Sequence, residues 1–137
     1  MNCRRLAVVL GAVAAFVAMV NVAPARAHHS FAAEFDAEKP VTVKGVITSV
    51  RLENPHSWFF LDVTGPEGKV ERWSFEASTP SSLIRSGFKP GTVKPGDQVT
   101  IRGFHARDAN ANAGAGRELI LADGREIAIG PSVGPGR

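Results

Sequence analysis

The chain has 137 residues and a single cysteine, with 16 Lys or Arg against 13 Asp or Glu. This length is typical of one domain. Three of the basic residues lie in the first 27 positions, so 13 basic residues remain against 13 acidic ones, and the positive net charge does not favour nucleic-acid binding. Cys3 lies in the same segment, so the rest of the chain has no cysteine, which excludes a disulfide, a thiolate metal ligand or a cysteine nucleophile there.

The first 27 residues have the three-part pattern of a secretory signal peptide. A basic start precedes an uncharged apolar run at 6–22, and Ala25-Arg26-Ala27 fits the small-x-small cleavage rule. We therefore predict cleavage after Ala27, export to the periplasm and a mature chain without a membrane span. Cleavage two residues earlier and an uncleaved membrane anchor are the alternatives, although the apolar run is at the short end for a span.

After the leader, short runs of alternating apolar and polar residues predict strands that are separated by turn residues. An extended lead-in at 28–40 precedes predicted strands at 41–52, 56–64, 69–77, 98–107, 118–122 and 125–129. Phe31 and Phe35 are expected to anchor the lead-in to the strands, although 32–34 can also form a turn of helix. The apolar phase of the first strand switches at Gly45, which predicts a β-bulge or a bend at that residue.

A short helix is predicted from Thr79 to Gly87, between the third and fourth strands. Thr79 fits the N-cap, Pro80 the first turn and Gly87 the C′ position. The segment 108–116 contains only Asp, Asn, Ala and Gly, a composition that predicts a mobile low-complexity loop. The Gly- and Pro-rich tail at 130–137 is expected to be disordered.

The order of three strands, a short helix and two or three further strands matches the five-stranded OB barrel. We therefore predict an all-β domain at 28–129, a small OB-like barrel of five to six strands that follows the signal peptide at 1–27. In this prediction the one short helix joins strands three and four. The alternative fold is another small β-barrel or a sandwich.

Two short motifs of the mature chain are distinctive, His28-His29-Ser30-Phe31 and Asn54-Pro55-His56. Together with 27–36, 40–42, the aromatic strand after His56, Lys94-Pro95-Gly96-Asp97 and Leu121-Ala122-Asp123-Gly124, they resemble DUF6152, a family of small exported bacterial proteins without an assigned activity. The resemblance covers essentially the whole mature chain. It implies export and a small β domain, and it implies neither a substrate nor catalytic residues.

All four histidines, His28, His29, His56 and His105, lie after the leader. Cleavage after Ala27 would make His28 the first residue, so that its α-amino group and its imidazole can chelate one metal ion together. His29 or His56 can add a further nitrogen, and a nitrogen-rich site favours Cu(II), followed by Zn. The α-amino group must lose its proton to bind, so affinity is expected to fall in acid. The alternative is that these histidines are solvated or structural.

The predicted strand at 56–64 has large apolar residues on both of its faces. One face carries Phe59, Leu61 and Val63, which have the pattern of barrel core, and the other carries His56, Trp58, Phe60 and Asp62. OB folds bind ligands on the outer face of their second and third strands. Trp58, Phe60 and Arg72 are therefore candidate contacts for a small ligand or a protein partner. The alternative is that Phe31 and Phe35 fold over these aromatic residues and bury them.

The sequence does not favour an enzyme. It has no evident Ser/His/Asp order and no glycine-rich phosphate loop at a strand–helix junction. The acidic residues of the second and third strands and the loop before them, Glu53, Asp62, Glu71 and Glu76, fit solvated strand-face charges. The overall expectation is a periplasmic binding module, and an accessory subunit of an exported enzyme is a further alternative.

Overall fold

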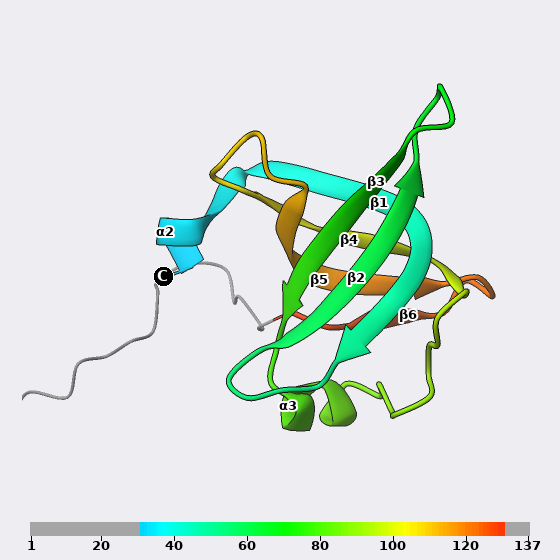
Figure 1. The fold of residues 1–137 in the computed structure, drawn as a ribbon. Coiled ribbons are helices and arrows are strands. Elements are labelled where there is room, and N and C mark those ends of the chain that lie inside the picture. The colour runs from blue at the N-terminus through cyan, green and yellow to red at the C-terminus, as the bar shows by residue number, and fades with distance from the viewer. Residues whose placement is uncertain (1–30, 131–137) are drawn as a thin grey trace, which may run out of the picture.

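The computed structural model describes residues 31–130, which form one strongly curved sheet (Figure 1). The elements in chain order are α2 (Phe31–Glu34), β1 (Phe35–Arg51), β2 (Ser57–Thr64), β3 (Val70–Ala77), α3 (Pro80–Arg85), β4 (Gln98–Ala106), β5 (Ala113–Leu121) and β6 (Glu126–Ala128). In this part of the chain no helix is long and apolar enough to cross a membrane. The predicted signal peptide and the predicted disordered tail from 131 onward lie outside the described residues.

The strands are hydrogen-bonded in the order β3-β2-β1-β4-β5-β6, and an additional pairing of β3 with β5 closes five of them into a ring. The closing pair is parallel, whereas every other pair is antiparallel. With α3 between β3 and β4, this is the connectivity of the OB barrel. The predicted all-β, OB-like barrel with a short helix after the third strand is confirmed.

The long strand β1 bends because it serves two partners. Its first part pairs with β4 as far as Val46, and from Val46 onward it pairs with β2. Gly45 precedes this change of partner, and a Cβ added there would meet the backbone oxygen of Asp62 at 2.8 Å. Of the two alternatives predicted at Gly45, a bulge is not found there, since the register shifts between Ile47 and Ser49, whereas a bend fits the change of partner at Val46. Gly45 instead permits the close crossing of β1 and β2.

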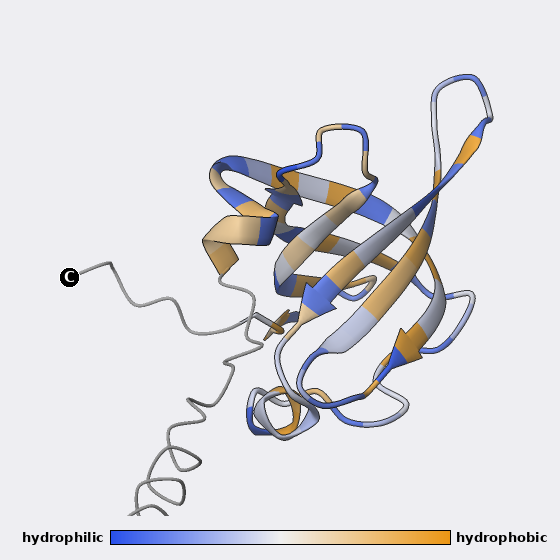
Figure 2. Ribbon diagram, turned by 60° about the vertical axis from the view of Figure 1, so that its left-hand side comes forward, coloured by the Kyte–Doolittle hydropathy of each residue, from blue (hydrophilic) through white to orange (hydrophobic). Residues whose placement is uncertain are grey.

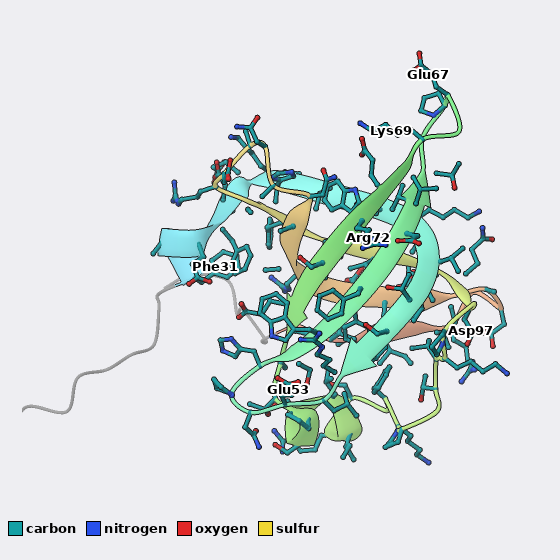
Figure 3. The ribbon with its side chains drawn as sticks, in the orientation of Figure 1. Phe31, Glu53, Glu67, Lys69, Arg72 and Asp97 are labelled. Atoms are coloured by element: carbon teal, nitrogen blue, oxygen red, sulfur yellow. The ribbon has the colours of Figure 1, made fainter. Side chains whose placement is uncertain are left out.

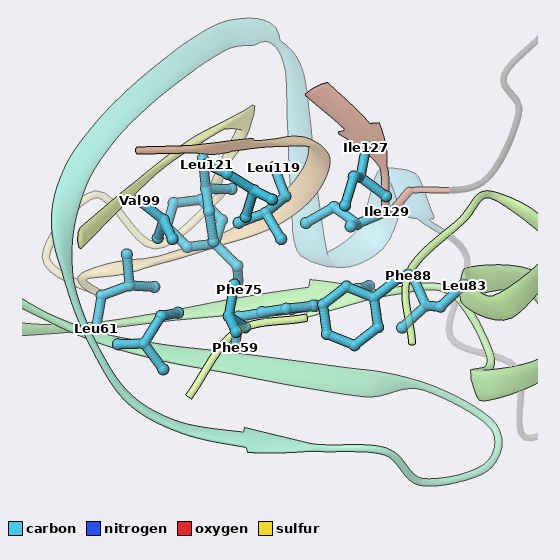
Figure 4. Packing of buried hydrophobic residues seen from close by; sticks show 14 of the residues in the cluster. Phe59, Leu61, Phe75, Leu83, Phe88, Val99, Leu119, Leu121, Ile127 and Ile129 are labelled. Carbon is cyan, nitrogen blue, oxygen red and sulfur yellow. The ribbon is translucent and has the colours of Figure 1, made fainter. Parts of the chain in front are cut away.

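Side chains alternate between the inside and the outside of the barrel, and Figure 2 shows the corresponding alternation of hydropathy along the strands. The inner positions form one apolar cluster (Figure 4), in which Phe59, Leu61, Phe75, Ile101 and Leu119 are fully buried. This cluster fills the interior, so the barrel has a packed core. Any ligand must therefore bind on the outside or at a rim.

The helix α3 begins at the predicted cap, where the side-chain oxygen of Thr79 accepts a hydrogen bond from the backbone N–H of Ser82. Leu83 and Phe88 are buried against the core, and the ring of Phe88 meets Phe59 edge to face at 5.4 Å. The helix therefore closes one end of the barrel. Ile84, on the same helix, does not take part in this packing and is 54% exposed.

The segment predicted to be a mobile loop at 108–116 is a loop only as far as Asn112, because β5 begins at Ala113 and takes up the last four residues. Its small residues are what allow the barrel to close. A Cβ on Gly103 of β4 would lie 1.9 Å from the backbone oxygen of Ala115, and one on Gly114 would lie 2.6 Å from that of Phe104. The glycine and alanine residues that give 113–116 its low complexity are small enough for the strands to pack this closely.

In the lead-in, Phe31–Glu34 forms the helical turn that was the alternative for 32–34, and the chain is extended from Phe35 onward, where β1 begins. Phe35 is buried, and the ring of Phe31 contacts both Phe35 and Phe104. The side chain of Arg107 donates a hydrogen bond to the backbone oxygen of Ala32, and its backbone N–H donates to that of Glu34. The turn is therefore anchored to the end of β4, as Figure 1 shows.

Candidate functional site

The outer face of β2 carries two aromatic rings that the barrel leaves partly exposed. Trp58 and Phe60 are both half-buried, and their rings are nearly parallel, with an interplanar angle of 21° and 6.4 Å between centroids. The guanidinium of Arg51, on the neighbouring strand β1, lies 5.0 Å from the centroid of Phe60. A cation over a ring at an exposed site contributes about 0.5–1 kcal/mol. These three side chains form a surface with stacking area and a positive charge.

His56 lies at the start of β2, on the same face, and is paired with a carboxylate. Its Nδ1 is 2.5 Å from Oε1 of Glu76 on β3. The imidazole is 43% exposed, whereas the Glu76 side chain is only 15% exposed. Burial raises the pKa of Glu76, Glu34 on α2 raises it further, and the His56 hydrogen bond opposes both effects. The carboxyl group is therefore held in a desolvated position, with His56 covering it.

Cross-strand pairing connects these residues to the lead-in. Outward-facing residues follow one another across five strands in the order Phe104, Ala115, Glu76, Trp58 and Arg51, which we call the outer row. At one end of the outer row, the ring of Phe104 is contacted by Phe31 at 5.9 Å and by the guanidinium of Arg117 at 5.8 Å. The outer row therefore runs from α2 to the aromatic pair of β2.

Arg72, the predicted cation of this face, lies further along β3. Its side chain is 93% exposed, and its Nε is 3.9 Å from Oδ1 of Asp62, directly across the β2–β3 pair. Four residues along each strand separate this pair from Trp58 and Glu76. Figure 3 shows Arg72 in the upper part of the β2–β3 pair, toward the hairpin that carries Glu67. The cation on the aromatic rings is Arg51, which the sequence analysis did not single out.

The expected cover of the aromatic pair is not formed by the described lead-in. Among the ring contacts of residues 31–130, none joins Phe31 or Phe35 to Trp58 or Phe60, since Phe31 packs on Phe104 and Phe35. Both β2 rings keep part of their surface open.

The predicted metal ligands are only partly described. His28 and His29 lie outside the described residues, and His56 is paired with Glu76. The fourth histidine, His105, is elsewhere, with its ring edge-to-face on Trp73 at 5.6 Å and its Nδ1 2.7 Å from the backbone oxygen of Ala106. Between residues 31 and 130 there is no cluster of three or more His, Cys, Asp or Glu side chains that can hold a metal ion.

Sequence reasoning missed Glu76, which it treated as a solvated strand-face charge. A charged residue that alternates with Ser74 and Arg72 gives no sign of burial by itself. Its role depends on the cross-strand register that places it beside Trp58 and within reach of His56. The only sign in the sequence that this end of the strand could carry a functional pair was the position of His56 directly after Asn54-Pro55.

One shallow cavity of about 260 Å³ lies away from this face, between the loop before β4 and the β5–β6 hairpin. Its charged groups are paired locally, because Arg125 donates to the Asp123 carboxylate and Asp97 accepts from the backbone N–H of Lys94. The charged side chains Arg125 and Asp97 of this cavity are therefore already engaged in local hydrogen bonds.

Comparison with known proteins gives a family and no function. No curated protein matches the chain. The model of a family of unknown function, DUF6152, matches residues 15–115, which is well over half of the chain and includes the whole of β1 to β4. The match also spans His28, His29 and His56, the residues on which the metal hypothesis depends. The chain therefore belongs to the DUF6152 family.

Proposed function

We propose that this protein is an exported, non-enzymatic binding module that holds its ligand on the outer face of β2. The observation that carries this proposal is the aromatic pair Trp58 and Phe60, which stays partly exposed beside Arg51 although the barrel core is complete without it. OB folds commonly bind ligands on the corresponding face. Large aromatic side chains that are left open to water are costly unless something covers them.

The chemistry of the face favours a small ligand with a planar or ring-shaped apolar part. The apolar part of the ligand can stack on the indole of Trp58. An anionic or hydrogen-bonding group of the same ligand can bind the guanidinium of Arg51 in place of the Phe60 ring. A protein partner that inserts a side chain at the same place is the alternative occupant. Both occupants would cover the same two rings.

Fluorescence of Trp58 tests this function directly. The chain has two tryptophans, so Trp73→Phe leaves Trp58 as the only indole emitter. We expect acrylamide to quench the emission of Trp58. When a compound from a panel of planar and carbohydrate molecules binds, the emission wavelength should shift and quenching by acrylamide should decrease. Trp58 emission that acrylamide cannot reach would show that the face is already covered and would contradict the proposal.

Export is the second part of this proposal, and it rests on the leader at 1–27. The leader predicts a periplasmic protein whose first residue is His28. The intact mass of the protein recovered from the periplasm would identify that residue. A mass that includes the apolar run at 6–22 would contradict processing and favour a membrane anchor.

A metal ion is the second candidate ligand, and the exposed imidazole of His56 favours it. The amine and imidazole of His28, with His29 and His56, would give a nitrogen-rich site for Cu(II), with Zn as the second choice. We expect the processed protein to bind Cu(II) stoichiometrically. One extra residue before His28 moves the free amine away from the first imidazole, so it should weaken binding sharply, and unchanged uptake would refute the terminal chelate.

A further inference from the structure

We propose that the ligand on the outer face of β2 is a neutral, linear, β-linked oligosaccharide, which lies along the strand and packs its sugar rings on Trp58 and Phe60. This inference rests on the binding function proposed above and names the chemical class of the ligand. It also gives a role to hydroxyl groups on β1 and β3, the two strands that flank β2 (Figure 1).

The first observation is the common orientation of the two rings. Trp58 and Phe60 are successive outward residues of β2, and their ring planes differ by only 21° across 6.4 Å. A sugar ring has an apolar face of C–H bonds, which can pack on an aromatic ring as other apolar surfaces do. Because the two rings have nearly the same tilt, they suit two units of a flat chain better than two units of a curved one. The pair therefore fits an extended chain of sugar rings.

The second observation is the β-bulge in β1 beside these rings. The register shifts between Ile47 and Ser49, so Thr48 is the extra residue, and Ser49 lies directly opposite Phe60. Ile47 is buried and Val50 packs against the core, so the two residues between them are left on the outer side. Bulges commonly redirect side chains next to functional sites. This bulge brings two hydroxyl groups to the β1 side of the Phe60 ring.

A third hydroxyl group lies on the other side of Phe60, because Ser74 of β3 is its cross-strand partner. Within residues 31–130, the hydroxyls of Thr48, Ser49 and Ser74 take part in no side-chain hydrogen bond. A hydroxyl can both donate and accept, so each can pair with a sugar hydroxyl of either role. An apolar surface bordered by a few polar groups is typical of small-molecule sites. The surroundings of Phe60 therefore favour a ligand with hydroxyl groups around an apolar face.

The charge balance of this face favours a neutral ligand. Arg72 is paired with Asp62, and His56 is paired with Glu76. Among the described residues of the face, Arg51 is the cation that has no carboxylate partner. A nucleic-acid strand is held mainly by several cations on its phosphates, so one guanidinium does not favour it. Arg51 can instead donate hydrogen bonds to the neutral oxygens of a sugar.

The test measures binding through the fluorescence of Trp58 in the Trp73→Phe protein, with cellohexaose and chitohexaose as two neutral β-linked probes. We expect saturable binding of at least one of them. Maltohexaose is the matched control ligand for cellohexaose, because it has the same composition but α-linkages that curve the chain. It should bind about 10-fold more weakly, since it cannot pack on both rings at once. Equal affinity for the two glucose chains would overturn the flat-chain ligand.

Substitution of the serines tests the hydroxyl groups. Ser49→Ala and Ser74→Ala each remove one hydrogen bond to the sugar, so each should weaken binding about 2- to 10-fold. Thr64→Ala is the matched control, because Thr64 is an exposed hydroxyl residue of β2 that lies four positions beyond Phe60. It should leave the affinity unchanged. Full affinity in both serine variants would overturn the assignment of a hydroxylated ligand.

Titration of the wild-type, ¹⁵N-labelled protein with the same probes does not depend on the folding of a variant. We expect the largest changes in amide shift at Ser49, Phe60 and Ser74. Largest changes at the cavity between Asp97 and Arg125 would place the sugar elsewhere and overturn the proposal.

Salt and charged probes test the charge argument. The affinity for the neutral chain should stay constant between about 50 and 200 mM salt, because no ion pair forms on binding. Hexagalacturonate and hexathymidylate are the anionic probes, one a sugar and one a nucleic acid. Tighter binding of either anion than of the neutral chains would overturn the neutral oligosaccharide.

The outcomes separate this inference from the function on which it rests. If acrylamide quenches Trp58 but neither cellohexaose nor chitohexaose binds, the oligosaccharide is overturned while the open face remains. If acrylamide cannot reach Trp58, both proposals are overturned. Saturable binding of a β-linked chain that Ser49→Ala and Ser74→Ala weaken, and that Thr64→Ala does not, is the expected result.

Discussion

The two faces of β2 carry similar side chains in opposite surroundings. Phe59 and Leu61 point into the barrel and are completely buried, whereas Trp58 and Phe60 point outward and are only half-buried. Strand alternation accounts for the inner pair, because the inward positions of a closed barrel must be apolar. It does not account for the outer pair. The comparison shows that Trp58 and Phe60 lie outside the core cluster and keep part of their surface open, and the proposed binding role rests on this difference.

The largest expected effect distinguishes the two faces by stability. Phe59→Ala should reduce the free energy of unfolding by about 3–5 kcal/mol, because it leaves a cavity in a packed core. Trp58→Ala should reduce it by about 1 kcal/mol, since the indole is only partly buried. Urea denaturation of both variants measures the difference. Losses of equal size would show that the outer rings belong to the core.

A smaller effect tests the inner packing where the barrel closes. In Gly114→Ala the new Cβ would lie 2.6 Å from the backbone oxygen of Phe104 and 2.9 Å from Cε1 of Phe75. Overpacking of this kind costs about 1–3 kcal/mol. Gly65→Ala is the matched control, since its nearest neighbour would be 3.5 Å away. Thermal unfolding should separate the two variants, and equal melting temperatures would mean that the β4–β5 contact tolerates a methyl group.

The smallest effect compares the two arginines of the outer face. Arg51→Ala removes a cation from the ring of Phe60 and should cost about 0.5–1 kcal/mol. Arg72→Ala should cost less, because its side chain is 93% exposed and its ion pair with Asp62 is 3.9 Å long. A double-mutant cycle with Phe60→Leu isolates the Arg51 contribution. A coupling energy of zero between Arg51 and Phe60 would mean that the guanidinium does not stabilise the ring and is available for another interaction.

Sequence patterns were sufficient for the parts of the fold that depend on local alternation and capping. The inward positions of β2 and the cap at Thr79 follow from short stretches of sequence and are confirmed. Closure of the barrel was missed at Ala113–Gly116, because glycine and alanine have no hydrophobic periodicity to reveal a strand. Such a strand forms only when β3 and β4 lie on either side of it, and that is a long-range condition.

The candidate site was predictable only in part, for the same reason. Trp58 and Phe60 were recognised because alternation alone places them on one face. Arg51 and Glu76 join them through the registers of β1 and β3 with β2, which no local pattern specifies. His28 and His29 lie outside the described residues, so their part in a metal site stays a prediction.

The most direct test of binding on the outer face of β2 is to add Cu(II) to the processed, ¹⁵N-labelled protein and to map the paramagnetic broadening of its amide signals. We expect broadening centred on His56, Trp58 and Glu76, with the signals of His105 and of the hairpin tip at Glu67 preserved. Broadening centred on His105, or confined to residues before Phe31, would contradict the proposal that this face supplies a ligand.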